Sequence, residues 1–370
     1  MKIYNLIWGF SLGAGIDKCY LTYCDLSSVD NSLEIYSACI NLTNLNTDFS
    51  ALKEKDIEII NIKHQLDFSW INKLKISIDK SKPDILFVHG FNGAIISLLI
   101  KFLKGVNIPV VCTYHGLYHA PTISKRILEP FYNGLSRYVY KSIAKKIICV
   151  ENMSRDFLIK KGVSDHKIVT VYNGLMPLKK IKKIDLKKYN ISNNELIIIT
   201  ASRITEVKGL PYLLQAIALI KNKSKFPFKY FMIGDGPDLP MLKKMINQLN
   251  IDDCVKCIGY QPNISSWLDV ADIFALPSLS EYHSIAILEA MRSGTSIVAT
   301  DVGGNGESLR HMQDGILVPS KDVNKFSNAL LELINNKNTR IKYGKSAKKR
   351  FEENFTENSM KLNLVKVLKS

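Results

Sequence analysis

Short apolar runs alternate with longer amphipathic stretches along the whole chain. Runs such as residues 85–89 and 196–201 are apolar at nearly every position, which is typical of parallel strands buried on both faces. Residues 210–221 and 239–249 instead carry apolar side chains at helical spacing. The predicted strands are residues 3–8, 58–61, 85–89, 110–114, 146–150, 196–201, 229–233, 254–258, 273–277, 297–300 and 315–318. This alternation of strand and helix predicts a doubly wound α/β architecture.

The alternating pattern is interrupted once, at residues 171–177, which contain Asn173-Gly174 and Pro177. Asn-Gly and Pro are strong turn signals, and a lysine-rich stretch follows them. We therefore place a domain boundary here, between residues 1–174 and 175–350. In open α/β sheets, ligands bind beyond the carboxyl ends of the strands. Residues that directly follow strands are the candidates for function.

The composition is that of a globular protein, with 46% apolar and 23% charged residues, which excludes bulk disorder and a small disulfide scaffold. Lysine and arginine number 50 against 34 acidic residues, a formal net charge of +16. Such a surplus favours nucleic acid, an anionic membrane or phosphorylated substrates as partners. Seven cysteines, an odd number spread along the chain, indicate a reducing compartment. The apolar runs are shorter than the ~20 residues that a bilayer span requires.

Two features of the N-terminal half could bind a ligand. Gly13 and Gly15 follow the first predicted strand and precede a helical pattern. Closely spaced glycines let the backbone approach a phosphate at a helix N-terminus, although tight turn packing explains them equally well. His115 follows the strand at residues 110–114, where it could orient or polarise a hydroxyl group. A purely structural histidine remains the alternative.

The C-terminal half carries further candidates after its strands. Arg203 and Lys208 follow residues 196–201, and an arginine and a lysine at one strand end can converge on a diphosphate. Two exposed cations are the alternative. Gly234 and Gly236 follow residues 229–233, where they could admit a ligand or simply form the turn.

The segment after residues 273–277 combines a predicted helix with two carboxylates. The helix is expected over residues 284–293, with Ser284 as its N-cap. Glu281 lies in the loop before it and Glu289 within it. Free N–H groups at the helix start could hold a phosphate, and the carboxylates could accept hydrogen bonds from sugar hydroxyls. A salt bridge would also satisfy such a carboxylate.

Together these motifs resemble the retaining glycosyltransferases of the GT-B fold in glycosyltransferase family 4 (glycosyl transferases group 1). The marker is E-x7-E, here Glu281 through Glu289. The matching motifs in order are Arg203 with Lys208-Gly209, Gly234-Asp235-Gly236-Pro237, Glu281 with Glu289, Gly303-Gly304 with Glu307, and Asp314-Gly315. The resemblance covers residues 196–320 well. It implies two Rossmann-like domains facing a central cleft.

The resemblance also implies a role for each part of the chain. Residues 1–174 would bind the acceptor and residues 175–350 the nucleotide sugar, while residues 351–370 would form a helix that crosses back to the N-terminal domain. The implied catalytic residues are His115, Arg203, Lys208 and Glu281. The implied donor-binding residues are Gly13, Gly15, Arg203, Lys208, Gly234, Gly236, Glu281, His283, Ser284, Ile285 and Glu289. Arg203 and Lys208 would stabilise the departing diphosphate, Glu289 would bind the ribose, and Glu281 the transferred sugar.

The implied reaction is the retaining transfer of a hexose-type sugar from a nucleotide diphosphate sugar, UDP being commonest in the family. The implied acceptor is a glycan, lipid-linked in bacterial O-antigen, capsule or lipopolysaccharide synthesis. No metal or other cofactor is implied: no clear D-x-D motif is present, and the C-x-x-C of Cys254 and Cys257 lacks a second ligand pair.

The basic surplus suggests peripheral docking on the anionic inner face of the cytoplasmic membrane. The candidate contacts are Lys125, Arg126, Arg137, Lys141, Lys145 and Lys146, with the apolar Ile127, Leu128 and Phe131 between them. An ordinary solvated helix is the alternative.

Two departures from the family pattern stand out. Tyr282-His283-Ser284 follow Glu281 where Gly-Phe-Gly is common, and the first loop reads Gly-Ala-Gly where Gly-Gly-Ala is common. Three other functions stay open. A GT-B-shaped nucleotide-sugar epimerase would convert the donor without an acceptor. A non-catalytic relative would bind nucleotide sugar without turnover. A nucleic-acid-binding protein would explain the charge, but no motif of that class is recognisable.

Overall fold

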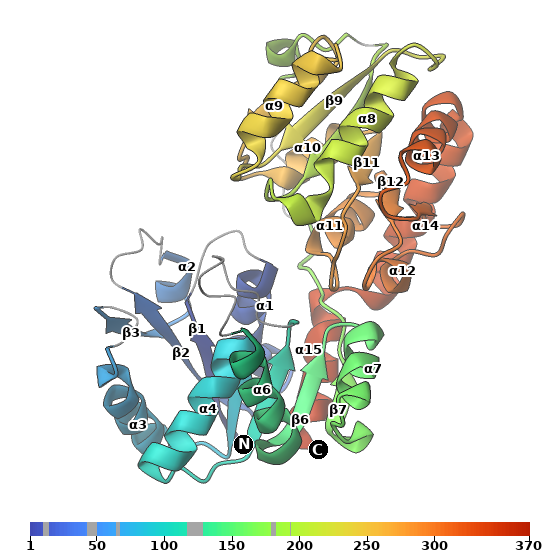
Figure 1. Cartoon of the computed structure of the whole chain (residues 1–370). Coiled ribbons are helices and arrows are strands. Elements are labelled where there is room, and N and C mark those ends of the chain that lie inside the picture. Colours follow the sequence, from blue (N-terminus) through green and yellow to red (C-terminus); the bar gives the residue numbers. More distant parts are fainter. Residues whose placement is uncertain (10–14, 43–49, 64–66, 117–128, 179–182, 193) are drawn as a thin grey trace. The chain divides into compact units, whose positions relative to one another are not determined.

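The computed structural model describes residues 1–9, 15–42, 50–63, 67–116, 129–178, 183–192 and 194–370. The chain forms two compact units, which are coloured from blue to red along the sequence in Figure 1. The N-terminal unit comprises Met1–Asn173 together with Glu357–Ser370, and the C-terminal unit comprises Gly174–Thr356. The predicted end of the second domain at residue 350 is therefore too early, because residues 351–354 complete a helix of the C-terminal unit.

The N-terminal unit is built on a parallel sheet with the strand order β3-β2-β1-β4-β5-β6-β7 among the described residues. Its strands are β1 (Lys2–Trp8), β2 (Glu34–Leu42), β3 (Glu58–Ile62), β4 (Ile85–His89), β5 (Val110–Tyr114), β6 (Ala144–Cys149) and β7 (Ile168–Thr170). Its helices are α1 (Gly15–Tyr23), α2 (Ser50–Lys53), α3 (Ser69–Ser81), α4 (Gly90–Lys104), α6 (Glu129–Tyr138), α7 (Asn152–Lys160) and α15 (Glu357–Lys369). The order outward from β1 in both directions is that of a Rossmann-like doubly wound sheet.

Two strands of this sheet were not predicted. β2 interleaves polar residues with apolar ones, and two of the polar residues, Ser37 and Asn41, interrupt the apolar run that marks a buried strand. Asn5 of β1 lies fully buried and donates a hydrogen bond from Nδ2 to Ser37 Oγ over 3.2 Å, which satisfies the polar group inside the sheet. β7 has only three residues, too few to show a periodicity.

Helix α15 belongs to the N-terminal unit although it lies at the other end of the sequence. Lys361 is buried and its Nζ lies 2.6 Å from Asp25 Oδ2. Lys369 forms a second ion pair, with Asp30. Buried Leu364 and Leu368 supply the apolar face of the helix. The helix starts at residue 357, later than the predicted 351.

The C-terminal unit contains a second parallel sheet with the order β10-β9-β8-β11-β12-β13 among the described residues. Its strands are β8 (Leu196–Ala201), β9 (Phe228–Ile233), β10 (Val255–Gly259), β11 (Ile273–Leu276), β12 (Ser296–Thr300) and β13 (Ile316–Val318). Its helices are α8 (Leu210–Lys221), α9 (Leu239–Gln248), α10 (Ile264–Val270), α11 (Ile285–Ser293), α12 (Asn305–Ser308), α13 (Val323–Asn335) and α14 (Lys337–Asn354). Both sheets confirm the predicted doubly wound α/β class.

The central strands of both sheets explain why the apolar runs were informative. β4, β5, β11 and β12 are buried at every position, as expected when helices cover both faces of a parallel sheet. The predicted bounds of α8 are correct. α11 ends at Ser293 and is followed by Gly294, whose φ of 74° is the left-handed conformation that commonly ends a helix. Within the described ranges, none of the helices combines the length and apolar character of a membrane span.

Candidate active site

The candidate site of the C-terminal unit forms where β8 and β11, neighbours in the sheet, reach their carboxyl ends. The loops that follow them are joined by a backbone hydrogen bond of 2.7 Å from Leu279 N to Val207 O. Gly209 adopts a φ of +61°, and a Cβ atom on it would lie 2.1 Å from the carbonyl oxygen of Pro277. The loops therefore approach too closely for any other residue at position 209.

The joined loops bring Lys208 and Glu281 into an ion pair. Lys208 Nζ lies 2.6 Å from Glu281 Oε1, and the two side chains are 22% and 10% exposed. Ser278 Oγ donates a second hydrogen bond of 2.6 Å to the same oxygen. Ser278 is itself fully buried, and its carbonyl oxygen accepts a 2.6 Å hydrogen bond from Thr300 Oγ1. The carboxylate of Glu281 is thus fixed by a cation and a hydroxyl.

Ser278 and Thr300 were not identified as site residues from the sequence. The available signal was the position of Ser278, which directly follows a predicted buried strand. The partnership with Thr300 depends on β11 and β12 being neighbours in the sheet, which the sequence alone does not establish.

Arg203 lies on the same loop as Lys208 and is exposed. Its guanidinium makes no hydrogen bond or ion pair with the described part of the chain. The loop is anchored beside it, since Ile204 N donates a 2.8 Å hydrogen bond to Asp235 O in the loop after β9. An exposed guanidinium and an adjacent half-buried ammonium at one sheet edge are suited to an anionic ligand.

Gly234 and Gly236 have a packing role in the same region. Gly234 has a φ of +137°, and a Cβ atom on it would lie 1.9 Å from Ser202 O. A Cβ atom on Gly236 would lie 2.1 Å from Ile204 O. Both glycines thus let the β9 loop pack against the β8 loop, as in the turn alternative, and their contact with a donor stays a prediction.

The start of α11 follows the predicted bounds. Ser284 occupies the N-cap position, but its side chain makes no capping hydrogen bond. Glu289 lies half-buried within the helix, where its charge partly offsets the lowering of the pKa of Arg292 by burial. Arg292 in turn donates a 2.7 Å hydrogen bond from Nη1 to Met176 O.

The two bulky residues after Glu281 point in different directions. His283 is 4% exposed, and its ring lies 5.3 Å from the ring of Phe355. Burial lowers the pKa of His283 to about 3, so the imidazole is neutral at neutral pH. Tyr282 is 36% exposed. Only the tyrosine side chain is therefore open to a ligand, while the histidine is part of the interior.

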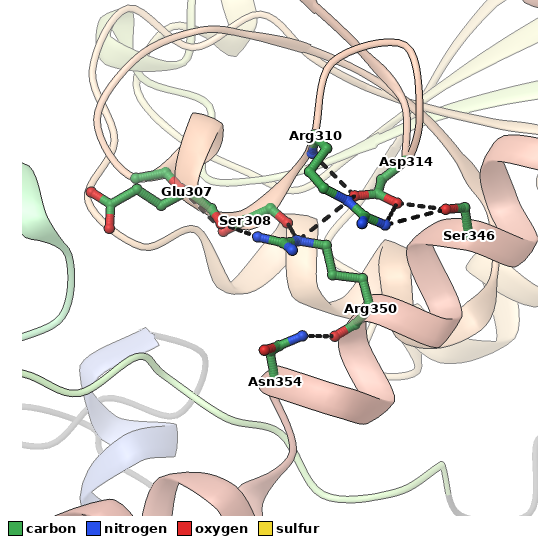
Figure 2. A network of polar contacts seen from close by, with 8 residues as sticks. Glu307, Ser308, Arg310, Asp314, Ser346, Arg350 and Asn354 are labelled. Atoms are coloured by element: carbon green, nitrogen blue, oxygen red, sulfur yellow. Dashed lines mark hydrogen bonds and ion pairs between the residues drawn. The ribbon is translucent and has the colours of Figure 1, made fainter.

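The segment around Gly303-Gly304, which follows β12, is hydrogen-bonded to the loop that carries Glu281 and Tyr282. Gly304 N donates a 3.0 Å hydrogen bond to Tyr282 O, and Asn305 Nδ2 donates one of 2.9 Å to Thr300 O. Figure 2 shows the polar network that follows α12 in the sequence, in which Arg310, Ser346 and Arg350 surround Asp314.

His115 lies in the N-terminal unit, directly after β5. Burial lowers its pKa to about 4, and its buried Nε2 atom makes no hydrogen bond with the described residues. His89, at the end of β4, is held by Thr113 Oγ1 at 3.1 Å from Nδ1 and by Asn5 Oδ1 at 2.5 Å from Nε2. His89 is therefore structural, whereas the neutral imidazole of His115 retains hydrogen-bonding capacity.

Several predicted residues lie outside the described residues. Gly13 is among them, and Gly15 is the first residue of α1. The proposed membrane contacts that also fall outside are Lys125, Arg126, Ile127 and Leu128. On α6, Phe131 is 66% exposed and Arg137 is exposed. Within the described ranges, no group of three or more His, Cys, Asp or Glu residues is placed to hold a metal ion.

Two protein families match the chain. The model described as "Glycosyl transferases group 1" matches residues 181–350, and that described as "Glycosyltransferase Family 4" matches residues 56–177. The chain belongs to the family 4 glycosyltransferases. The family predicted from the motifs is thereby confirmed, and so is the prediction of an enzyme of the hexosyltransferase class.

Relatives of this glycosyltransferase include named enzymes. This chain is 29% identical over 297 residues to the amylovoran biosynthesis glycosyltransferase AmsK of Erwinia amylovora. The aligned region covers 77% of this chain and 70% of AmsK. The chain is 28% identical over 285 residues to the UDP-Gal:alpha-D-GlcNAc-diphosphoundecaprenol alpha-1,3-galactosyltransferase of Escherichia coli, which covers 75% of this chain and 73% of that enzyme.

Solved structures support the fold. HepE from Anabaena, solved with UDP, superposes with a TM-score of 0.81 at 17% identity over 100% of both chains. HepE has also been solved with UDP-glucose. These similarities confirm the predicted GT-B fold with two Rossmann-like domains.

Proposed function

We propose that this glycosyltransferase transfers a hexose from a UDP-sugar, with retention of anomeric configuration, to a hydroxyl of a lipid-linked glycan during bacterial polysaccharide synthesis. The observation that carries the proposal is the set formed by exposed Arg203 and the Lys208–Glu281 ion pair at the carboxyl edge of one sheet. Support for UDP comes from HepE, which was solved with UDP and UDP-glucose. Support for the acceptor comes from the name of the Escherichia coli relative, a galactosyltransferase acting on a diphosphoundecaprenol-linked sugar.

The two cations account for leaving-group stabilisation. As the bond between the sugar and the diphosphate breaks, negative charge develops on the diphosphate. Fixed positive groups beside that charge lower the barrier because they need no reorganisation. The Arg203 guanidinium makes no hydrogen bond or ion pair with the described residues and is exposed, so it is open to such a ligand. The Lys208 ammonium is already held in place by Glu281. We propose that this pair supplies the charge that a metal supplies in other transferases.

The carboxylates and the histidine would orient the sugar and the nucleotide. Glu281 has one oxygen occupied by Lys208 and Ser278, and its other oxygen would accept a hydrogen bond from a hydroxyl of the transferred sugar. Glu289 would accept hydrogen bonds from the ribose. His115, neutral because burial lowers its pKa to about 4, would contact a sugar hydroxyl and not act as a proton donor.

A lipid-linked acceptor would bring the enzyme to the inner face of the cytoplasmic membrane. The net charge of +16 favours an anionic surface. On α6, Phe131 is 66% exposed and Tyr138 47% exposed, and exposed Arg137 lies between them in the sequence. We propose this helix as part of the docking face, because aromatic side chains and cations together favour the membrane interface.

Calorimetric titration with UDP, GDP, ADP and CMP in the presence of EDTA tests the donor assignment. We expect UDP to bind, and Arg203→Ala and Lys208→Ala each to weaken it about tenfold or more, the effect of losing one charge-assisted hydrogen bond. Lys256→Ala is the matched control, since this exposed lysine of β10 donates to Asp252 O. Absence of binding by every nucleotide would refute the nucleotide-sugar assignment.

Product analysis tests the reaction itself. With UDP-hexoses and a diphosphoundecaprenol-linked N-acetylhexosamine, we expect an α-linked product from an α-linked donor, as retention requires. A β-linked product would refute retention. Conversion of the donor sugar without an acceptor would indicate an epimerase, and binding without turnover would indicate a non-catalytic relative.

A further inference from the structure

Two arginines share one buried carboxylate beside α12. Asp314 is fully buried, and Arg310 approaches it with Nε at 2.7 Å from Oδ2 and Nη2 at 2.8 Å from Oδ1. Arg350 Nε lies 3.7 Å from Oδ2. Burial pushes the pKa of Asp314 upward, but the hydrogen bonds from Arg310 and Ser346 outweigh it, so the pKa lies below its ordinary value. The carboxylate is therefore charged at neutral pH and holds both arginines.

Only one of the two arginines reaches α12. Arg350 donates a 2.7 Å hydrogen bond from Nε to Ser308 O and one of 2.9 Å from Nη2 to Glu307 O (Figure 2). The last carbonyl groups of a helix lack partners within it, and α12 has only four residues. A single guanidinium from α14 thus caps the C-terminal end of α12. Arg310, in contrast, contacts Asp314 and Ser346.

The other end of α12 holds the loop that carries Glu281. Gly304 N, at the N-cap of α12, donates to Tyr282 O over 3.0 Å. Asn305 Nδ2 donates to Thr300 O over 2.9 Å. Thr300 Oγ1 in turn donates to Ser278 O, and Ser278 Oγ to the Glu281 carboxylate, each over 2.6 Å. An unbroken series of contacts therefore links the Arg350 guanidinium to Glu281.

We propose that Arg350 is a positioning residue of the donor site. By holding the carbonyl groups of Glu307 and Ser308, it fixes α12, and α12 fixes residues 278–282 through Gly304 and Asn305. The relevance to donor binding rests on the proposed function, whereas the effect on the loop is a property of the unliganded protein. Among the described residues, the Arg310 side chain hydrogen-bonds to Asp314 and Ser346 and not to α12, so Arg310 provides a matched control for the loss of one arginine from the network.

Hydrogen–deuterium exchange of the unliganded protein tests the effect on the loop. In Arg350→Ala, we expect the Gly304 and Leu279 amides to exchange about tenfold faster, the change that the loss of one to two hydrogen bonds produces. In Arg310→Ala, these amides should exchange at the wild-type rate. Arg350→Lys keeps one donor group and should restore part of the protection. Where Arg350→Ala does not fold, Arg350→Lys against Arg310→Lys makes the same comparison.

Titration with UDP tests the consequence for the donor site. We expect Arg350→Ala to weaken UDP binding about five- to tenfold, and Arg310→Ala to leave it within about twofold. The proposal would be overturned if both alanine variants raised the exchange rates of the Gly304 and Leu279 amides equally, or if Arg350→Ala left those rates unchanged. Faster exchange with unchanged UDP affinity would overturn the positioning role. If the wild-type protein binds no UDP, the proposed function fails, and the amide exchange alone decides whether Arg350 fixes the loop.

Discussion

Replacing Gly209 by alanine would disturb the candidate site through the backbone. Gly209 combines a φ of +61° with a contact in which an added Cβ atom would lie 2.1 Å from Pro277 O. The left-handed conformation costs an ordinary residue about 1–2 kcal/mol. Because non-bonded heavy atoms rest more than 3 Å apart, the Pro277 carbonyl and Gly209 must separate by roughly 1 Å.

That displacement acts on both sides of the ion pair. Residue 209 is adjacent to Lys208, and the Pro277 carbonyl begins the loop that carries Glu281. A misplacement of about 1 Å in a site can lower a reaction rate about 100-fold, which corresponds to about 2.7 kcal/mol of barrier. For stability we expect a loss of about 2 kcal/mol, or a Tm lower by roughly 4–8 °C for a unit of this size.

Initial rates of sugar transfer and a thermal unfolding scan measure the two effects. The control is Gly105→Ala, because Gly105 has a φ of +64° and no atom within 4 Å of the added Cβ. The control should therefore show the cost of the conformation alone, about 1–2 kcal/mol, with normal transfer. Transfer by Gly209→Ala within about threefold of wild type would refute the reasoning, since a 1 Å shift should cost far more.

Three further predictions concern a buried hydroxyl, a buried imidazole and a buried ammonium. Ser278→Ala, which removes the hydroxyl held 2.6 Å from Glu281, should lower kcat about tenfold in steady-state assays; unchanged kcat contradicts this role. Unfolded His283 binds a proton below a pKa of about 6.5, whereas the folded residue does so only below about 3. The contribution of neutral His283 to the free energy of unfolding is therefore complete above pH 6.5. Below pH 6.5 it decreases by about 1.4 kcal/mol per pH unit. Urea unfolding should show that His283→Gln loses less unfolding free energy between pH 7 and pH 5 than the wild-type protein does. Equal losses in the two proteins would count against this. Lys361→Met should reduce the free energy of unfolding, by less than the roughly 3–5 kcal/mol of a fully buried ion pair because Asp25 is 40% exposed, whereas exposed Lys366→Met should change it little.

The strands of the sheet centres were predictable from the sequence because their environment is uniform. Where helices cover both faces, every position is apolar, and β11 and β12 show this pattern over their full length. β2 was missed because its polar residues are satisfied by partners elsewhere in the sheet, such as Asn5 for Ser37. Such compensation is a tertiary property that no local pattern records.

The site was predictable where a motif marks it and not where the fold assembles it. Glu281 and Lys208 were identified from their motifs, but their ion pair depends on β8 and β11 being neighbours. Ser278 and Thr300 lie 22 positions apart in the sequence and meet only through the sheet. His283 was assigned to the donor site through its backbone amide, which stays a prediction, and the sequence did not show that its ring is buried.

The separation of α15 from its partners has a consequence for synthesis on the ribosome. Asp25 and Lys361 are 336 positions apart, and Asp30 and Lys369 are 339 apart. At an elongation rate of ~5–20 residues per second, roughly 17–70 s would pass between the synthesis of Asp25 and that of Lys361. The C-terminal unit, in contrast, is one continuous segment, Gly174–Thr356. The nascent chain can therefore complete the second unit before the first, and until α15 emerges the first unit leaves exposed the apolar surface that Leu364 and Leu368 later cover.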